Sequence, residues 1–403
     1  MSGADRAQGG EGLAGGRGRI DSIDLVRGLI IVVMALDHVR DFFGDPGARP
    51  TDLATASAAL FFTRWITHIC APVFFLLTGT GAYLRHSRMS TAALARFLLT
   101  RGLWLIFLEL VVMRFALQFN LDYQVTVITV LWALGWSMMV LAALIWLPLW
   151  AIALFGVLLV AGHNALDAVD PGAHSDLLAR LWVVLHEPGF LLRGSHTVRI
   201  AYVLVPWVGV TALGYVLGAA YGWAAGARQR LLMRLGVALI AAFVVLRFSN
   251  VYGDPSQWAW QSVPLRTAMS FVNTTKYPPS LLFLLMTLGP ALLLLRAFDG
   301  RVPALLRPAL VFGRVPLFFY VLHFYLIHLL AVGVSFVRYG EVAQMFRSPD
   351  LGHFPFSAPP GWDVGLAAIY LIWIGVVAAL YPLCRGFAGF RARHREWWWL
   401  SYL

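Results

Sequence analysis

The stretch RGRIDSIDLVRGLIIVVMALDHVRDFFG, residues 17–44, decides how the rest of the chain is interpreted. Its centre is apolar enough to cross a bilayer, yet it carries Arg27 near one end and Asp37-His38 near the other. Charged and titratable groups at membrane depth are costly, and those that persist usually face a cavity or a partner. The stretch therefore predicts a membrane-spanning helix whose charged and titratable residues have a functional role.

The spacing of these groups indicates what that function requires. His38 lies eleven positions after Arg27, and eleven steps of about 100° return a side chain to within about 20° of the same helix face. At about 1.5 Å per residue, the two groups lie roughly 16 Å apart, about half the hydrocarbon thickness. The residues on this stripe are Arg27, Ile31, Met34, His38 and Asp41. A cation and a base on one helix face would suit an elongated ligand that extends along the helix across the membrane.

The composition is that of a polytopic α-helical membrane protein. Hydrophobic residues make up 60% of the 403 residues and charged residues 13%, whereas a soluble domain is about one quarter charged. The net charge of +11 is explained by arginines that anchor the cytoplasmic ends of spans, so no nucleic-acid partner is expected. The two cysteines, Cys70 and Cys384, fall in different spans and offer no disulfide framework.

We expect an all-α fold of about ten membrane spans. They are placed at 22–43, 59–84, 94–118, 125–147, 149–163, 200–221, 231–250, 278–296, 311–337 and 363–384. Of the 31 basic residues, 18 fall in the tails and in alternate short connections, which predicts that both termini are cytoplasmic. Residues 1–18 are expected to form a disordered cytoplasmic tail, 19–390 the transmembrane domain, and 391–403 a basic and aromatic cytoplasmic tail.

Several segments resemble a known family in the order expected along the chain. They are RIDSIDLVRGLIIVVMALDH (19–38), APVFFLLTGTG (71–81), VLWALGWSMMVLAAL (130–144), VPWVGVTALGYVLG (205–218), KYPPSLLFLLMTLG (276–289) and GRVPLFFYVLHFYLIHLL (313–330). They are similar to membrane acyltransferases related to heparan-α-glucosaminide N-acetyltransferase. The first also resembles the acyltransferase-3 and osmoregulated-glucan succinyltransferase families, in which an Arg, ten residues and a His recur in the first span.

The resemblance implies a membrane acyltransferase that uses acyl-CoA, expected to be acetyl-CoA, and a saccharide or glycan-like acceptor, without a metal. One departure affects the catalytic residue. In the lysosomal acetyltransferases, the His proposed to handle the acetyl group lies in the loop after the first span, and residues 44–57 here contain no His. That role would pass to His38 or to His68, or be absent, and heparan is not an expected substrate.

His38 is the main candidate for a general base, because an imidazole suits proton transfer near neutral pH. Asp41, three residues further, is expected to hold the His38 ring, whereas Asp37 points elsewhere on the helix and is counted among the substrate-binding candidates. The alternative is that the Asp-His-Val-Arg-Asp run only ends the helix at the interface. His68 is a second candidate for the site, or else a histidine bonded to a neighbouring helix.

Arg27 is a candidate to bind acyl-CoA phosphates, since guanidinium gives multidentate recognition of anions, or else it is a topology anchor paired with Asp24. Arg96 and Arg101 are placed on the acyl-CoA side by the resemblance. The remaining substrate-binding candidates are Glu109, which needs a partner near mid-membrane, Lys276, the only lysine, and His323. Metal binding by His323 and His328 is rejected, because no carboxylate or cysteine accompanies them.

Two functions of different class remain open. In the first, acyl-CoA binds from the cytoplasm and an extracytoplasmic sugar hydroxyl or amine is acylated, with His38 as base or acyl carrier. In the second, a proton-coupled transporter or flippase, the same polar groups line a transport path without covalent chemistry. A bacterial inner membrane is the expected location. The sequence leaves monomer and homo-oligomer open.

Overall fold

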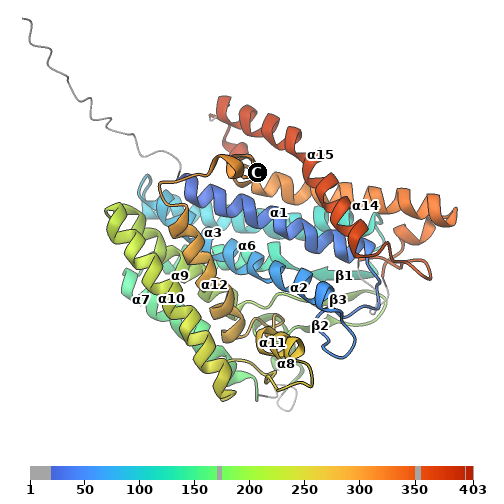
Figure 1. Ribbon diagram of the computed structural model, residues 1–403. Helices are drawn as coiled ribbons and strands as arrows, with labels where there is room; N and C mark the ends of the chain where they lie inside the picture. Colours follow the sequence, from blue (N-terminus) through green and yellow to red (C-terminus); the bar gives the residue numbers. More distant parts are fainter. Residues whose placement is uncertain (1–19, 170–174, 350–354, 395, 403) are drawn as a thin grey trace, which may run out of the picture.

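The computed structural model describes residues 20–169, 175–349, 355–394 and 396–402, and their fold is almost entirely helical (Figure 1). The predicted tail at 1–18 lies outside the described residues. The α-helices are α1 (Asp21–Phe43), α2 (Ala58–Ile66), α3 (Cys70–His86), α4 (Thr91–Phe107), α5 (Arg114–Gln118), α6 (Val130–Leu144), α7 (Leu149–Gly162), α8 (Asp176–Leu185), α9 (Val205–Gly218), α10 (Ala225–Ser249), α11 (Pro264–Val272), α12 (Leu281–Ala297), α13 (Arg307–Arg314), α14 (Pro316–Tyr339) and α15 (Leu366–Arg393).

Six helical segments of the described chain are long and apolar enough to cross a membrane, so the chain is a multi-pass membrane protein. They are Ala58–His86, Leu149–Leu166, Val205–Gly222, Ala225–Ser249, Pro316–Tyr339 and Leu366–Arg393. Helices α6 and α12 are apolar but shorter. Helix α1 is long enough, but its charged residues lower its hydropathy. The total of about ten spans and the cytoplasmic location of both termini stay predictions.

A small sheet stands where the fourth span was expected to begin. Strand β1 (Val125–Ile128) pairs in parallel with β3 (Thr197–Ile200), and β3 pairs antiparallel with β2 (Gly189–Leu192). The prediction of a helix from residue 125 was wrong, because the β-branched run Val-Thr-Val-Ile pairs with the similar Thr-Val-Arg-Ile segment of β3. Helix α6 begins only at Val130, where the Glu109 side chain caps it.

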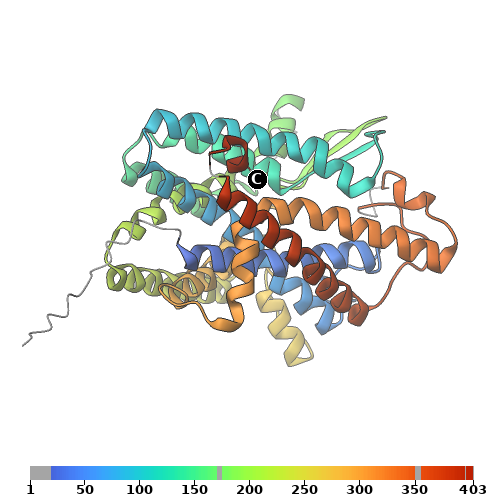
Figure 2. The ribbon, with the colours of Figure 1, turned by 90° about the horizontal axis from the view of Figure 1, so that it is seen from above.

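Helix α1 lies at the centre of the bundle, in contact with α3, α12, α13, α14 and α15 (Figures 1 and 2). Its approach to α13 requires two glycines. A Cβ on Gly28 would lie 1.8 Å from the carbonyl oxygen of Ala309, and one on Gly313 would lie 1.8 Å from that of Asp24. Because no side chain fits at either position, the two backbones are in contact. Arg27 of α1 therefore lies beside α13, and Arg314 of α13 lies beside α1.

Candidate active site

The His38 ring of α1 forms a pair with the His323 ring of α14. His38 Nδ1 lies 2.7 Å from His323 Nε2, and the two rings are stacked with centroids 4.9 Å apart. His323 is fully buried, whereas His38 is partly exposed. The sequence predicted both residues as members of the site, and the structure brings them together.

The hydrogen bonds assign the protons of the neutral pair. His323 Nδ1 lies 3.0 Å from the Phe319 carbonyl oxygen, which only accepts, so this nitrogen carries the proton. His323 Nε2 then has a lone pair and accepts from His38 Nδ1. Neutral His38 therefore keeps its lone pair on Nε2, to which no described residue donates a hydrogen bond. An oriented imidazole with a free lone pair is the arrangement that a general base needs.

The expectation that Asp41 holds the His38 ring does not match this geometry. Asp41 Oδ1 accepts from Arg40 Nη2 at 2.5 Å, and His323 occupies the position beside His38 Nδ1. The reason is that α14 packs directly along α1 and delivers a buried partner, while the last turn of α1 supplies Asp41 with a nearer cation. Asp41 belongs instead to a group of charges at the C-terminal end of α1.

That group, the ionic network, consists of Asp37, Arg40, Asp41, Arg64 and Lys276. Asp37 accepts from Arg40 Nη2 at 3.0 Å and from Arg64 Nη1, and Lys276 Nζ lies 4.0 Å from its Oδ2. Each member except Asp41 is largely buried. Lys276, the only lysine in the chain, thus reaches the residue next to His38 from a segment far away in sequence.

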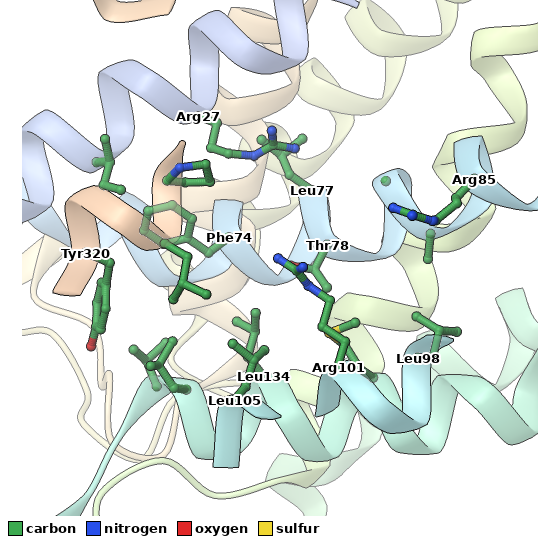
Figure 3. Close-up of a pocket in the computed structure, with 18 of the residues that line it drawn as sticks. Arg27, Phe74, Leu77, Thr78, Arg85, Leu98, Arg101, Leu105, Leu134 and Tyr320 are labelled. Carbon is green, nitrogen blue, oxygen red and sulfur yellow. The ribbon is translucent and has the colours of Figure 1, made fainter. Parts of the chain in front are cut away.

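A cavity of about 290 Å³ lies at the opposite end of α1, between α1, α3, α4, α6 and α14. We call it the arginine cavity, after the five arginines among its lining residues: Arg27, Arg85, Arg101, Arg314 and Arg391. The guanidinium groups of Arg27, Arg85 and Arg101 point toward one common space (Figure 3). Within the described chain no carboxylate lines the cavity, although Asp24 lies 3.1 Å from Arg27 and Asp21 3.6 Å from Arg314. The cavity suits a ligand with several negative charges.

Most of the remaining cavity wall is apolar, and the wall ends at Tyr320, which lies beside the histidine pair. Phe74, Leu105 and Leu134 line it between the arginines and Tyr320, which stands at the other end (Figure 3). The Tyr320 ring contacts both histidines edge-on, with centroids 6.3 Å from His38 and 5.6 Å from His323. A long ligand with an anionic head and a thin apolar arm would therefore extend from the arginines toward His38.

Three of the predicted site residues lie outside this arrangement. Glu109 accepts from the backbone N–H groups of Thr129 and Leu131, at 2.5 and 3.2 Å, and so caps α6. Arg96 is exposed on α4 and does not line the arginine cavity. His68 is buried against the Phe283 ring, with centroids 5.4 Å apart, and its Nδ1 has no hydrogen-bond partner in the described chain.

Sequence reasoning missed several residues of this site. Arg85, Arg314 and Arg391 were counted only as topology anchors, and Tyr320 and Arg64 were not singled out. The resemblance to the family depended on the spacing of Arg27 and His38. A single sequence does not distinguish an arginine that lines a cavity from one that faces the bilayer surface. His328, five residues beyond His323, belongs elsewhere: its two ring nitrogens lie 2.9 Å from the carbonyl oxygens of Ala116 and Met345.

These features define a class: multi-pass membrane proteins with a cationic cavity that ends at Tyr320, beside a histidine pair inside the bundle. Residues 19–246 match the family of the catalytic domain of heparan-α-glucosaminide N-acetyltransferase, and because this is more than half of the chain, the chain belongs to that family. The matched segment contains Arg27 and His38, whereas Lys276, Tyr320 and His323 follow it in the sequence. A search of curated proteins found no match to the chain.

Proposed function

We propose that the protein transfers an acetyl group from acetyl-CoA, bound in the arginine cavity, to an acceptor that reaches His38 from the other end of α1. The observation that carries the proposal is the arginine cavity, which is lined by five arginines, by Ile31 and by Tyr320, whose ring contacts those of His38 and His323. The phosphates of CoA match the arginines, and its pantetheine arm matches the apolar wall. The separation of Arg27 from His38, roughly 16 Å along α1, suits the length of such an arm.

The residues of the site would act as follows. His38 Nε2 takes the proton from the acceptor nitrogen or oxygen as that atom attacks the thioester carbon. The carbon–sulfur bond breaks, and the CoA thiolate leaves and is protonated by the imidazolium. His323, held by the Phe319 carbonyl, orients the His38 ring and shares the positive charge that develops on it. The same lone pair on Nε2 also allows an acyl-histidine intermediate, which would form without acceptor.

The experiment compares acetyl-CoA turnover by the purified full-length protein in nanodiscs with that of His38→Ala. We expect kcat to fall by about 10²- to 10⁴-fold, the usual contribution of a positioned base, while acetyl-CoA binding is retained. His196→Ala is the matched control, because His196 is exposed on an outlying loop and bonds only to the Tyr123 carbonyl.

Undiminished turnover in His38→Ala would place the base elsewhere, with His68 the next candidate. If the wild-type protein does not bind acetyl-CoA at all, the transferase proposal fails. A transporter or flippase, in which Arg27, His38 and His323 line a path without covalent chemistry, would then be the better explanation.

A further inference from the structure

Residues 396–402 lie between the end of α15 and helix α4. We call them the aromatic segment, after their three tryptophans and Tyr402. The segment follows the last turn of α15, which carries Arg391 of the arginine cavity, and Figure 2 shows it at the red end of the chain, beside α4. The family match ends at residue 246, so it assigns this segment no role.

One end of the aromatic segment is attached to the end of α15. The Trp397 N–H donates to the His394 carbonyl at 3.2 Å, and the Trp397 ring stacks on the His394 ring with centroids 4.6 Å apart. The same ring contacts that of Phe390 edge-on, with centroids 5.5 Å apart. Leu400 is buried. Because Arg391 follows Phe390 directly, these contacts fix the segment to the wall that α15 contributes to the arginine cavity.

The other end of the segment is attached to α4 through Tyr402. The Tyr402 hydroxyl lies 2.6 Å from Thr100 Oγ1, and its ring packs against that of Phe97 with centroids 5.9 Å apart. The Thr100 hydroxyl donates its single proton to the Arg96 carbonyl at 2.9 Å, so Tyr402 is the donor to Thr100. Two contacts about one turn apart on α4 therefore fix the position and the orientation of the Tyr402 ring.

Phe97 carries two of the five arginines of the cavity. The guanidinium carbon of Arg85 lies 3.9 Å from the centroid of the Phe97 ring, and that of Arg101 lies 5.9 Å from it. Both distances are within the range of cation–π interactions. Phe97 lines the arginine cavity together with these two residues. Because Tyr402 packs on the same ring, it restricts where the ring, and with it the two guanidinium groups, can lie.

This restriction matters for binding an anion. Arg85 and Arg101 carry like charges that point toward one space (Figure 3), and like charges repel each other. Long side chains also lose rotamer entropy when a ligand immobilises them, which weakens binding. Contacts that hold both guanidinium groups in place before the ligand arrives reduce this cost.

We propose that the aromatic segment sets the arginine cavity for the nucleotide part of acetyl-CoA, with Tyr402 as a positioning residue that acts through Phe97 on Arg85 and Arg101. The inference rests on the proposed acetyltransferase function. The nucleotide part carries the phosphates, which are the groups that guanidinium recognises. The segment should therefore affect how strongly the acetyl donor binds, and not the reaction at His38.

The test compares two acetyl donors that share the thioester and the pantetheine arm, acetyl-CoA and S-acetylpantetheine, of which only the first carries phosphates. With purified full-length protein in nanodiscs, we expect Tyr402→Ala to raise the KM for acetyl-CoA by roughly 3- to 30-fold, on the scale of a cation–π contact, while kcat changes little. The kcat/KM for S-acetylpantetheine should change much less, so the preference for acetyl-CoA should fall.

Two conservative variants separate the Tyr402 ring from its hydroxyl. Tyr402→Phe keeps the ring on Phe97 and removes the bond to Thr100, so the rise in KM should be smaller than in Tyr402→Ala. Thr100→Val removes the same bond from the α4 side and leaves the segment unchanged, so its effect should equal that of Tyr402→Phe. The double variant should be no worse than either single variant, because all three lack the same bond.

Tyr370→Ala is the matched control. The Tyr370 hydroxyl, on α15, lies 2.9 Å from Thr63 Oγ1 of α2, which makes it a second tyrosine–threonine pair between distant segments. Tyr370 does not line the arginine cavity. This variant should keep the wild-type KM for acetyl-CoA and the wild-type preference between the two donors.

The outcomes separate this inference from the function on which it rests. A loss of equal size with both donors in Tyr402→Ala would show a general structural role and overturns the inference, and so does an unchanged KM for acetyl-CoA. Equal kcat/KM of the wild type for both donors also overturns it, because the phosphates would then not be recognised. The transfer reaction stands in each of these cases. Failure of the wild type to bind acetyl-CoA is instead the failure of the proposed function.

Discussion

At the N-terminal end of α1, five arginines surround an open cavity of about 290 Å³, whereas near the C-terminal end Arg40 and Arg64 lie buried against carboxylates. The cavity has no lining carboxylate in the described chain, although Asp24 and Asp21 reach two of its arginines from outside. In the ionic network, by contrast, Asp37 alone receives Arg40, Arg64 and Lys276.

The difference shows that the same residue type serves two purposes at the two ends of one helix. Arginines that line a cavity beside apolar walls can contact a ligand there. Arginines that are enclosed with carboxylates fix helices to one another, because α1, α2 and the segment before α12 meet at Asp37. We therefore expect changes in the ionic network to affect stability first, and changes in the arginine cavity to affect ligand binding first.

The largest effect is expected from Asp37→Ala. It leaves the buried guanidinium of Arg64 without its carboxylate, and breaking a buried ion pair by removing one partner costs about 3–5 kcal/mol. The measurement is the free energy of unfolding of the purified protein in detergent. We expect a clear loss in Asp37→Ala and a partial recovery in Asp37→Ala/Arg64→Leu, since an apolar replacement of both partners removes the stranded charge.

Asp52→Ala controls for the loss of a carboxylate on the same side of the bundle, because Asp52 has only local hydrogen bonds. A wild-type unfolding free energy in Asp37→Ala would mean that the ionic network does not hold the helices, and the distinction between the two ends of α1 would disappear.

A smaller and different effect is expected from Arg101→Gln. Hydrogen bonds to charged groups contribute about 1.5–3 kcal/mol, so acetyl-CoA binding should weaken by roughly 10- to 100-fold. The measurement is acetyl-CoA binding in nanodiscs at two salt concentrations, with a weaker salt dependence expected in the variant.

Arg96→Gln is the matched control for that variant. Arg96 lies on the same helix, α4, but is exposed and outside the arginine cavity. Equal weakening of binding by both variants would show that only the general positive charge of this end matters, not the cavity.

The sequence predicted the stripe on α1 because helix geometry alone relates Arg27 to His38, and Arg27 and Ile31 of that stripe do line the arginine cavity. The close contact of α3 with α9 at Gly79 and Gly214, where a Cβ would meet backbone atoms at 2.0 and 2.1 Å, likewise depends on the small size of the two residues. Both are local consequences of spacing within one helix or of residue size.

The partners of the site residues depend on contacts between distant segments, which no spacing reveals. His323 stands 285 positions from His38, so Asp41 was the nearest available partner in the sequence. The assignment of β1 failed for the same reason: Val125–Ile128 is apolar enough for a span, and only its pairing with β3 makes it a strand. The roles of Arg64, Arg85 and Tyr320 likewise follow from the packing of separate helices.

The smallest effect is expected at Asp122, an ion pair in the connection between α5 and β1. Burial alone would raise the pKa of Asp122, but hydrogen bonds from the Gln124 N–H and the Ser348 hydroxyl, together with the Arg114 guanidinium, lower it below the ordinary value. A lowered pKa means that the carboxylate stabilises the fold above about pH 4, and that this contribution is lost as the pH falls through the folded-state pKa.

Because the Asp122 side chain is 35% exposed, the contribution should be well below that of Asp37. We expect Asp122→Asn to unfold at a slightly lower temperature than the wild type at pH 7. The difference should shrink steadily below pH 4, because the wild-type carboxyl then also becomes neutral. Thermal unfolding of both proteins between pH 3 and 7 measures this difference. If Asp122→Asn lost as much stability as Asp37→Ala, burial among cations would not explain why the ionic network stabilises the fold more than an exposed ion pair does.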